Sequence, residues 1–146
     1  MKIAIASDHG GFNLKEYLIK NIKDAEIIDE GCFSLESVDY PFYAKLVAND
    51  LQEGKANLGV LICTNGIGMS IAANKFKGIR AALVFNISMA EHARSHNNAN
   101  IICLGNDNVP FEDSLNFVEK FITTPFSYIE RHQRRVDEII KFEEEQ

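Results

Sequence analysis

The segment from Gly59 to Ser70 reads GVLICTNGIGMS. An apolar run typical of a strand stops at Cys63, a glycine-rich turn follows, and helical residues begin near Gly68. Open α/β sheets bind ligands at the carboxyl edge of their strands, and a helix N-terminus at that edge attracts anions and favours the thiolate form of a cysteine. The segment therefore predicts a parallel α/β sheet with a thiol presented at its ligand-binding edge.

The same alternation of apolar runs and helix-period segments continues along the chain. The predicted strands are Lys2–Ser7, Glu26–Asp29, Leu58–Ile62, Arg80–Phe85 and Asn100–Leu104. They lack a clean polar alternation, so both faces of the sheet must be covered. Helical stripes lie at Leu14, Leu18 and Ile22, at Tyr43, Val47 and Leu51, and at Leu115, Val118 and Ile122. We expect a three-layer α/β/α Rossmann-like domain with a five-stranded parallel sheet and an extended C-terminal helix.

Composition and length limit the class of protein. The 146 residues are 46% hydrophobic and 25% charged, which predicts one globular domain over residues 1–146. Three widely spaced cysteines without a CxxC pair or a zinc pattern indicate reduced thiols, and no apolar run suits a signal peptide or a membrane span, so we expect a cytoplasmic protein. A net charge of −6 argues against nucleic acid or an anionic membrane as a partner.

Cys63 allows two interpretations. Buried free cysteines commonly pack as small hydrophobic residues. Cys63 ends its strand, however, and the residues from Thr64 to Gly68 supply backbone N–H groups that could hold an oxyanion while the thiolate takes a proton. A phosphatase of the C-x5-R type would need an arginine at Met69, and a G-x-G-x-x-G dinucleotide fingerprint would need a glycine at Ile71.

Two polar clusters contain histidines. Asp8 follows a predicted strand and is equally well explained as a helix cap, whereas His9 lies beside two glycines in a turn that a ligand can approach. A solvated helix C-terminus explains most segments like the one around His96, and His92 fits that explanation. His96 could instead serve as an acid or base near neutral pH, with Asn97 donating to a developing oxyanion.

The last predicted helix contains several arginines. Arg131 and Arg135 stand four residues apart on one face, where like charges repel by about a few tenths of a kcal/mol unless an anion lies between them. Glu130 can pair with Arg134, while no acidic residue occupies a neighbouring helical position of Arg131. Arg131 and Arg135 are therefore the predicted phosphate ligands. Asp39, just ahead of Pro41, is expected to cap another helix through its side chain.

In combination, these motifs resemble the type B ribose-5-phosphate isomerase family, which also contains allose-6-phosphate and galactose-6-phosphate isomerases. The matching segments lie in the same order and are Asp8–Gly11, Asp39–Pro41, Cys63–Lys75, His96–Asn98 and Arg131–Arg135. The resemblance extends from Met1 to about Phe142. It implies interconversion of ribose 5-phosphate and ribulose 5-phosphate through a cis-enediolate, with no metal or other cofactor, in a homodimer or tetramer with sites at the subunit interface.

The resemblance also implies roles for single residues. Cys63 would be the base that moves a proton between C2 and C1, and His96 would open the sugar ring, reaching in from a partner subunit. Arg131 and Arg135 would hold the phosphate. The remaining implied substrate contacts are Asp8, His9, Thr64, Asn65, Gly66, Ile67, Gly68 and Asn97.

The chain departs from the family pattern at two positions. Asp107 stands where the family has a phosphate-binding arginine, and Asn65 stands where a hydroxyl residue is more common. Family members that lack the cysteine have a glutamate base at the position of Met69, so here the base must be Cys63. A six-carbon sugar phosphate is the alternative substrate, and a sugar-phosphate-binding regulator without turnover is the alternative of another class.

Overall fold

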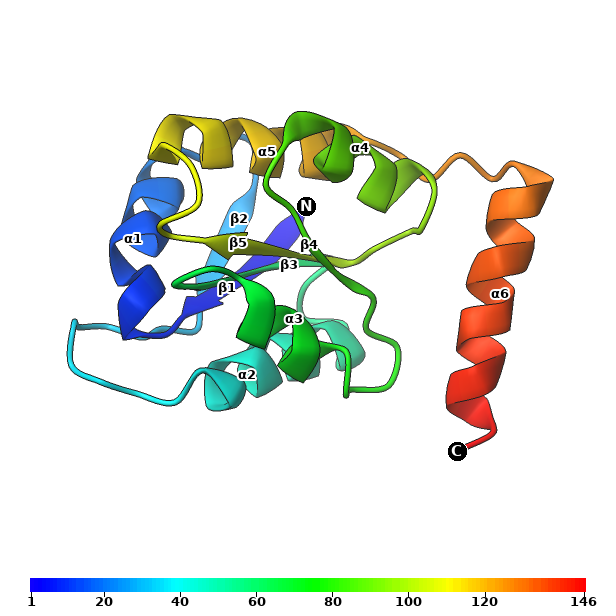
Figure 1. Ribbon diagram of the computed structural model, residues 1–146, viewed down its shortest axis with the longest axis horizontal. Coiled ribbons are helices and arrows are strands. Elements are labelled where there is room, and N and C mark those ends of the chain that lie inside the picture. The colour runs from blue at the N-terminus through cyan, green and yellow to red at the C-terminus, as the bar shows by residue number, and fades with distance from the viewer.

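The computed structural model describes residues 1–146 and contains one parallel sheet with helices on both faces (Figure 1). The strands are β1 (Lys2–Ser7), β2 (Glu26–Asp29), β3 (Leu58–Cys63), β4 (Ala81–Leu83) and β5 (Ile101–Gly105). The helices are the 3-10 turn η1 (His9–Gly11), α1 (Phe12–Asn21), α2 (Tyr40–Gln52), α3 (Ile67–Ala73), α4 (Ile87–Ser95), α5 (Phe111–Thr123) and α6 (Glu130–Glu144). The predicted fold class is confirmed.

The strands lie in the order β2-β1-β3-β5-β4, and every neighbouring pair is parallel. The central strands are buried along their length, as their unbroken apolar sequences predict. Three predicted strands differ in their bounds, and one of them is β5, which spans Ile101–Gly105 instead of Asn100–Leu104. β3 includes Cys63, and β4 is shorter than Arg80–Phe85 because the side chain of Asn86 accepts a hydrogen bond from Met89 N–H and starts α4.

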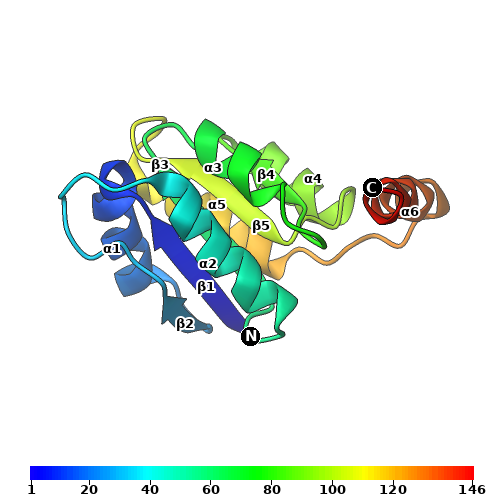
Figure 2. The same ribbon diagram turned by 90° about the horizontal axis from the view of Figure 1, so that it is seen from below.

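Two hydrophobic clusters hold the helices on the sheet. α1, α4 and α5 cover one face, where Leu14, Leu18 and Phe121 are fully buried. α2 and α3 cover the other face, where Val47 and Met69 are fully buried (Figures 1 and 2). Burying one such side chain contributes roughly 1.5–3 kcal/mol, so each predicted apolar stripe fixes its helix against the sheet.

The C-terminal helix α6 lies beside this sandwich and not on it (Figure 2). Only His132 and Val136 of the helix are buried. Ser127 N–H donates to the carbonyl of Ser95 at 3.0 Å ahead of the helix, and the carboxylate of Glu143 accepts from Gly78 N–H at 2.9 Å near its end. The predicted extended C-terminal helix is therefore present, tied to the rest of the chain mainly at its two ends.

The start of α2 differs from the expectation in one detail. Pro41 occupies the first turn, as predicted, and Asp39 is the N-cap residue. Its side chain makes no capping hydrogen bond, so the predicted role of the Asp39 carboxylate was wrong. None of the helices is long and apolar enough to cross a bilayer.

Candidate active site

The polar residues that follow β1 and β3 lie together at the carboxyl edge of the sheet. β1 and β3 are adjacent, with Ser7 opposite Ile62. The chain leaves β1 for α1 on one face of the sheet and leaves β3 for α3 on the other. Such a divergence at the strand ends creates the crevice in which open α/β sheets bind ligands.

Cys63 ends β3 at this edge and is only 5% exposed. Its Sγ accepts a hydrogen bond from Gly66 N–H at 3.2 Å. The strand-end position predicted for the thiol is present, and the sulfur has a polar partner as well as hydrophobic neighbours.

Glycine at position 66 is required for this contact. Gly66 is the N-cap of α3 and has a φ of +83°, a left-handed conformation that side chains disfavour. A Cβ there would lie 2.6 Å from Leu83 Cδ1 and 3.0 Å from the carbonyl carbon of Leu104. The tight turn thus brings the amide of the N-cap residue back onto the sulfur.

The amides of the loop from Thr64 to Gly68 are not all free. Gly66 N–H donates to the sulfur of Cys63, and Ile67 N–H donates to the side-chain oxygen of Asn65 at 3.0 Å. The backbone carbonyl of Asn65 accepts from the side-chain amide of Asn108 at 3.0 Å. Asn65 therefore shapes the loop with its oxygen and keeps its NH₂ group for other contacts.

Asp8 and His9 lie at the same edge, directly after β1. Asp8 is 7% exposed, and its carboxylate accepts from Gly11 N–H at 3.1 Å, so the capping role left open for it is real. His9 Nδ1 accepts from Val38 N–H at 3.2 Å. A Cβ on Gly10 would collide with the Thr64 hydroxyl, which shows how closely the turn after β1 approaches the loop after β3.

Two further segments, at the start of α2 and after β5, lie beside these loops. The ring of Tyr40, at the start of α2, lies against Gly68, where a Cβ would come within 2.7 Å of the ring. Asp107 follows β5, donates its N–H to the carbonyl of Thr64 at 3.1 Å, and accepts from the Asn106 amide at 3.0 Å. The contact of Tyr40 with Gly68 was not predicted. Tyr40 lies in the segment Asp39–Pro41, which matched the family but had no role assigned to Tyr40.

His96 and Asn97 lie at the opposite edge of the sheet. They end α4, just before β5 begins at Ile101, and Ile101 pairs with Gly59 at the start of β3. Cys63 is four residues further along β3, about 13 Å at the usual rise of a strand. One chain therefore does not bring His96 and Asn97 to Cys63.

His96 is instead the middle ring of a stack of three. The rings of His92 and His96 are 4.4 Å apart, and those of His96 and His132 are 4.2 Å apart. Ser127 Oγ lies 2.7 Å from His132 Nδ1. Burial lowers the pKa of His132, and the neighbouring His96, Arg131 and Arg135 lower it further. His92, expected to be a simple helix-end residue, is thus part of this stack.

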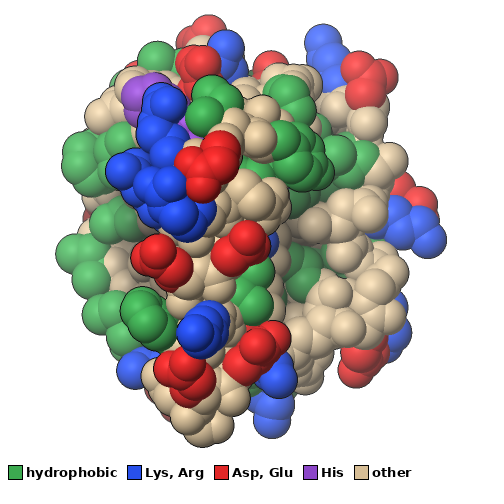
Figure 3. All heavy atoms as spheres, turned by 90° about the vertical axis from the view of Figure 1, so that its right-hand side faces the viewer, with side chains coloured by type: hydrophobic (Ala, Val, Ile, Leu, Met, Phe, Trp, Pro, Cys, Tyr) green, Lys and Arg blue, Asp and Glu red, His purple; other side chains and the backbone are tan.

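Arg131 and Arg135 lie on α6 beside the same stack and are exposed. Neither forms an ion pair, whereas Arg134 is paired with Glu130 at 2.7 Å, as predicted. Figure 3 shows histidine next to a group of Lys and Arg side chains on this side of the molecule. No group of three or more His, Cys, Asp or Glu side chains is placed to hold a metal ion.

The strand order and the thiol at the end of β3 define a Rossmann-like α/β protein with a candidate thiol-containing site at the carboxyl edge. Comparison with known proteins makes the class specific. The family model described as Ribose/Galactose Isomerase matches residues 3–139. The chain belongs to this family, and it is an isomerase.

Solved structures agree with this assignment. Ribose-5-phosphate isomerase B of Clostridium thermocellum is 43% identical, with a TM-score of 0.96 over 99% of both chains. A ribose 5-phosphate isomerase of Thermotoga maritima is 48% identical, with a TM-score of 0.93 over 96% of this chain and 97% of that one. Ribose-5-phosphate isomerase B of Mycoplasma genitalium, solved with bound ribulose 5-phosphate, is 40% identical, with a TM-score of 0.93 over 99% and 97%.

Proposed function

We propose that the protein interconverts ribose 5-phosphate and ribulose 5-phosphate in the cytoplasm, with Cys63 as the base. The observation that carries the proposal is the Cys63 sulfur, held by Gly66 N–H at the carboxyl edge next to Asp8 and His9. The related isomerases named above, one of them with bound ribulose 5-phosphate, support the choice of substrate.

The reaction moves one proton between neighbouring carbons. After the sugar ring opens, the thiolate of Cys63 removes the proton from C2 of the aldose, and the electron pair of that bond shifts so that the carbonyl oxygen on C1 becomes an enediolate oxygen. The thiol then returns the proton to C1, and the proton of the C2 hydroxyl passes to the oxygen on C1, so that C2 becomes the ketone and C1 becomes the alcohol. A positioned general base contributes typically 10²–10⁴-fold, and one donor to the oxyanion about 10²–10³-fold.

The enediolate donors come from the groups that remain free at this edge. Gly66 and Ile67 amides already have partners within the loop, so the side-chain NH₂ of Asn65 is the better placed donor on this chain. Asp8 and His9 contact the sugar from the turn after β1. Thr64 and Gly68 form the wall of the loop opposite them.

A complete site takes residues from two copies of the chain. One group of candidate residues lies at the amino edge of the sheet and along α6, and consists of His96, Asn97, Arg131 and Arg135. The other group lies at the carboxyl edge and consists of Cys63, Asp8 and His9. Each copy thus has one half of the candidate site residues at each edge of its sheet. In a twofold dimer the carboxyl edge of one subunit faces the histidine and arginine cluster of the other, so that both sites become complete.

Asp107 favours a second candidate substrate. Its carboxylate stands at the carboxyl edge, where an anionic phosphate would be repelled, so the phosphate must lie against Arg131 and Arg135 of the second copy. Asn106 holds the Asp107 side chain, which leaves its carboxylate able to accept from a sugar hydroxyl. A longer, six-carbon sugar phosphate such as allose 6-phosphate would offer such a hydroxyl. The ratio of kcat/KM for ribose 5-phosphate and allose 6-phosphate decides between the two.

The base is tested by Cys63→Ala, with Cys103→Ala as the matched control. Cys103 is fully buried in β5, where burial raises the pKa of its thiol. We expect Cys63→Ala to abolish isomerisation and the exchange of solvent tritium into substrate, while substrate binding persists and Cys103→Ala stays active. More than a few per cent of kcat in Cys63→Ala would show that the thiol is not the base. Absence of tritium exchange in the unmutated protein would mark a binding protein without turnover.

A further inference from the structure

The segment from Glu30 to Asp39, here named the strap, joins β2 to α2 and reaches the candidate active site at His9. Val38 N–H donates to His9 Nδ1 at 3.2 Å. A backbone N–H can only donate, so Nδ1 must present its lone pair, and the neutral ring then has its proton on Nε2. An imidazolium would set a second N–H against that of Val38. The contact therefore makes Nδ1 the acceptor and leaves Nε2 as the donor.

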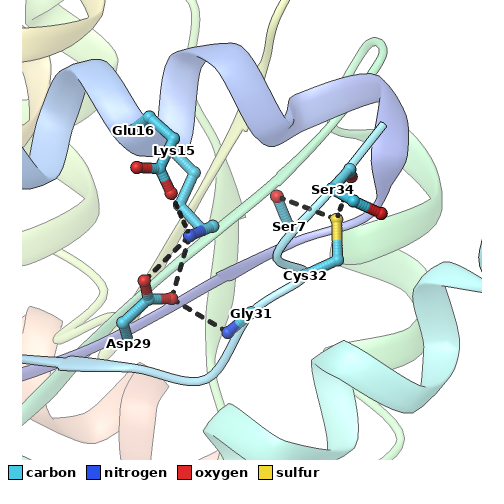
Figure 4. Close-up of polar contacts among 7 residues, drawn as sticks. All are labelled: Ser7, Lys15, Glu16, Asp29, Gly31, Cys32 and Ser34. Carbon is cyan, nitrogen blue, oxygen red and sulfur yellow. Dashed lines mark hydrogen bonds and ion pairs between the residues drawn. The ribbon is translucent and has the colours of Figure 1, made fainter. Parts of the chain in front are cut away.

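Lys15 of α1 is fully buried. It holds the chain at Asp29, directly before the strap begins, and this point is here named the root of the strap. Its Nζ lies 2.9 Å from both carboxylate oxygens of Asp29 and 2.9 Å from Glu16 Oε1 (Figure 4). The rings of Phe12 and Phe33 lie 5.6 and 5.3 Å from the ammonium. A buried ammonium is costly without such partners, so Asp29 cannot move away from Lys15 freely.

From Asp29 a chain of hydrogen bonds leads to the end of β1. The Asp29 carboxylate accepts from Gly31 N–H at 2.9 Å. The Gly31 carbonyl accepts from Ser7 N–H at 2.6 Å, and Cys32 N–H donates to the Ser7 carbonyl at 2.8 Å. Ser7 directly precedes the turn that contains His9. The ammonium of Lys15, the root of the strap and the active-site turn are therefore one connected structure.

The middle of the strap has no hydrophobic anchor of its own. Phe33 is 71% exposed and Leu35 is 63% exposed, and the residues from Ser34 to Ser37 are exposed as well. Core packing does not determine where Val38 lies. Its position depends on the root of the strap at one end and on the start of α2 at the other.

We propose that Lys15 is a positioning residue: through its ion pair with Asp29 it seats the strap so that Val38 N–H holds His9 as the Nε2–H tautomer. His9 then offers the substrate its Nε2–H as a hydrogen-bond donor in a fixed direction. The effect on turnover rests on the proposed function, because it takes His9 to contact substrate. The effect on the tautomer does not.

The test measures the His9 ring directly in the full-length protein. Nitrogen-15 NMR distinguishes protonated from unprotonated ring nitrogens, and His9→Gln identifies which of the four histidine signals belongs to His9. In the unmutated protein we expect an unprotonated Nδ1 and a protonated Nε2. In Lys15→Met we expect a mixture of tautomers and a KM for ribose 5-phosphate about tenfold higher, with kcat within about twofold. Lys55→Met, which removes the exposed pair with Glu53, is the control and leaves both unchanged.

The outcomes separate the two proposals. Should Lys15→Met fail to fold, as judged by circular dichroism, Asp29→Asn takes its place, because it removes the charge and keeps an oxygen for Gly31 N–H. An unchanged His9 tautomer and an unchanged KM in the folded variant overturn the positioning role. A shifted tautomer in a protein that never isomerises ribose 5-phosphate upholds the positioning role and refutes the proposed reaction.

Discussion

A site shared between two copies can be tested by mixing two inactive variants. Cys63→Ala removes the proposed base from the carboxyl edge, and His96→Ala removes the proposed ring-opening group from the amino edge. The four-residue separation along β3 and β5, about 13 Å, prevents one chain from using both groups in one site. In a mixed dimer, one site has both defects and the other has neither.

The expected recovery of activity follows from the number of intact sites in the mixture. Random pairing of equal amounts yields about half mixed dimers, each with one intact site of two, so the mixture should regain about one quarter of the unmutated activity. The assay is isomerisation of ribose 5-phosphate after the two variants have been dissociated and reassociated together. The control mixes Cys63→Ala with Asp8→Ala, whose changes lie at the same edge and which should recover nothing. Recovery in the control, or none in the test mixture, would refute the shared site.

Three further predictions concern binding and stability. Arg131→Ala should raise KM by about tenfold or more, because a charged phosphate contact is lost, whereas Arg134→Ala breaks only its exposed pair with Glu130 and should change KM by less than about twofold; steady-state kinetics measures both. Gly66→Ala should lower the free energy of unfolding by about 2–5 kcal/mol, since it forces a side chain into a left-handed residue packed against Leu104; urea unfolding measures it. Burial raises the pKa of Glu30, with its neighbour Asp50 adding to the shift, so the native state binds the extra proton and loses stability as pH rises through that pKa. Glu30→Gln should therefore be more stable than the unmutated protein at pH 8, by about a few tenths of a kcal/mol because Glu30 is only half-buried, with the difference gone near pH 4 in urea unfolding.

The fold was largely predictable, because each strand is too apolar to leave a face in water. The runs at Lys2–Ser7 and Glu26–Asp29 match β1 and β2 residue for residue. A predicted strand boundary was wrong where a side-chain hydrogen bond determines where the next helix starts, as at Asn86, which starts α4 and shortens β4. Strand order could not be predicted, because it depends on contacts between distant segments and on no local pattern.

The candidate site divides in the same way. Cys63 and His9 could be placed at one edge from their position after strands, since parallel strands end together. The separation of His96 from Cys63 required the pairing of Ile101 with Gly59, which no local pattern contains. Lys15 was missed because an apolar helical stripe gives no reason to expect a buried ammonium.

The lateral position of α6 separates folding from activity. Both hydrophobic clusters are complete without any residue of this helix, so a lone copy can fold before it meets another. Under a shared-site arrangement, the folded fraction and the working fraction then obey different equilibria. On dilution, the circular dichroism per chain would hold steady while turnover per chain falls, and the cellular abundance of the chain would set the threshold at which its activity begins.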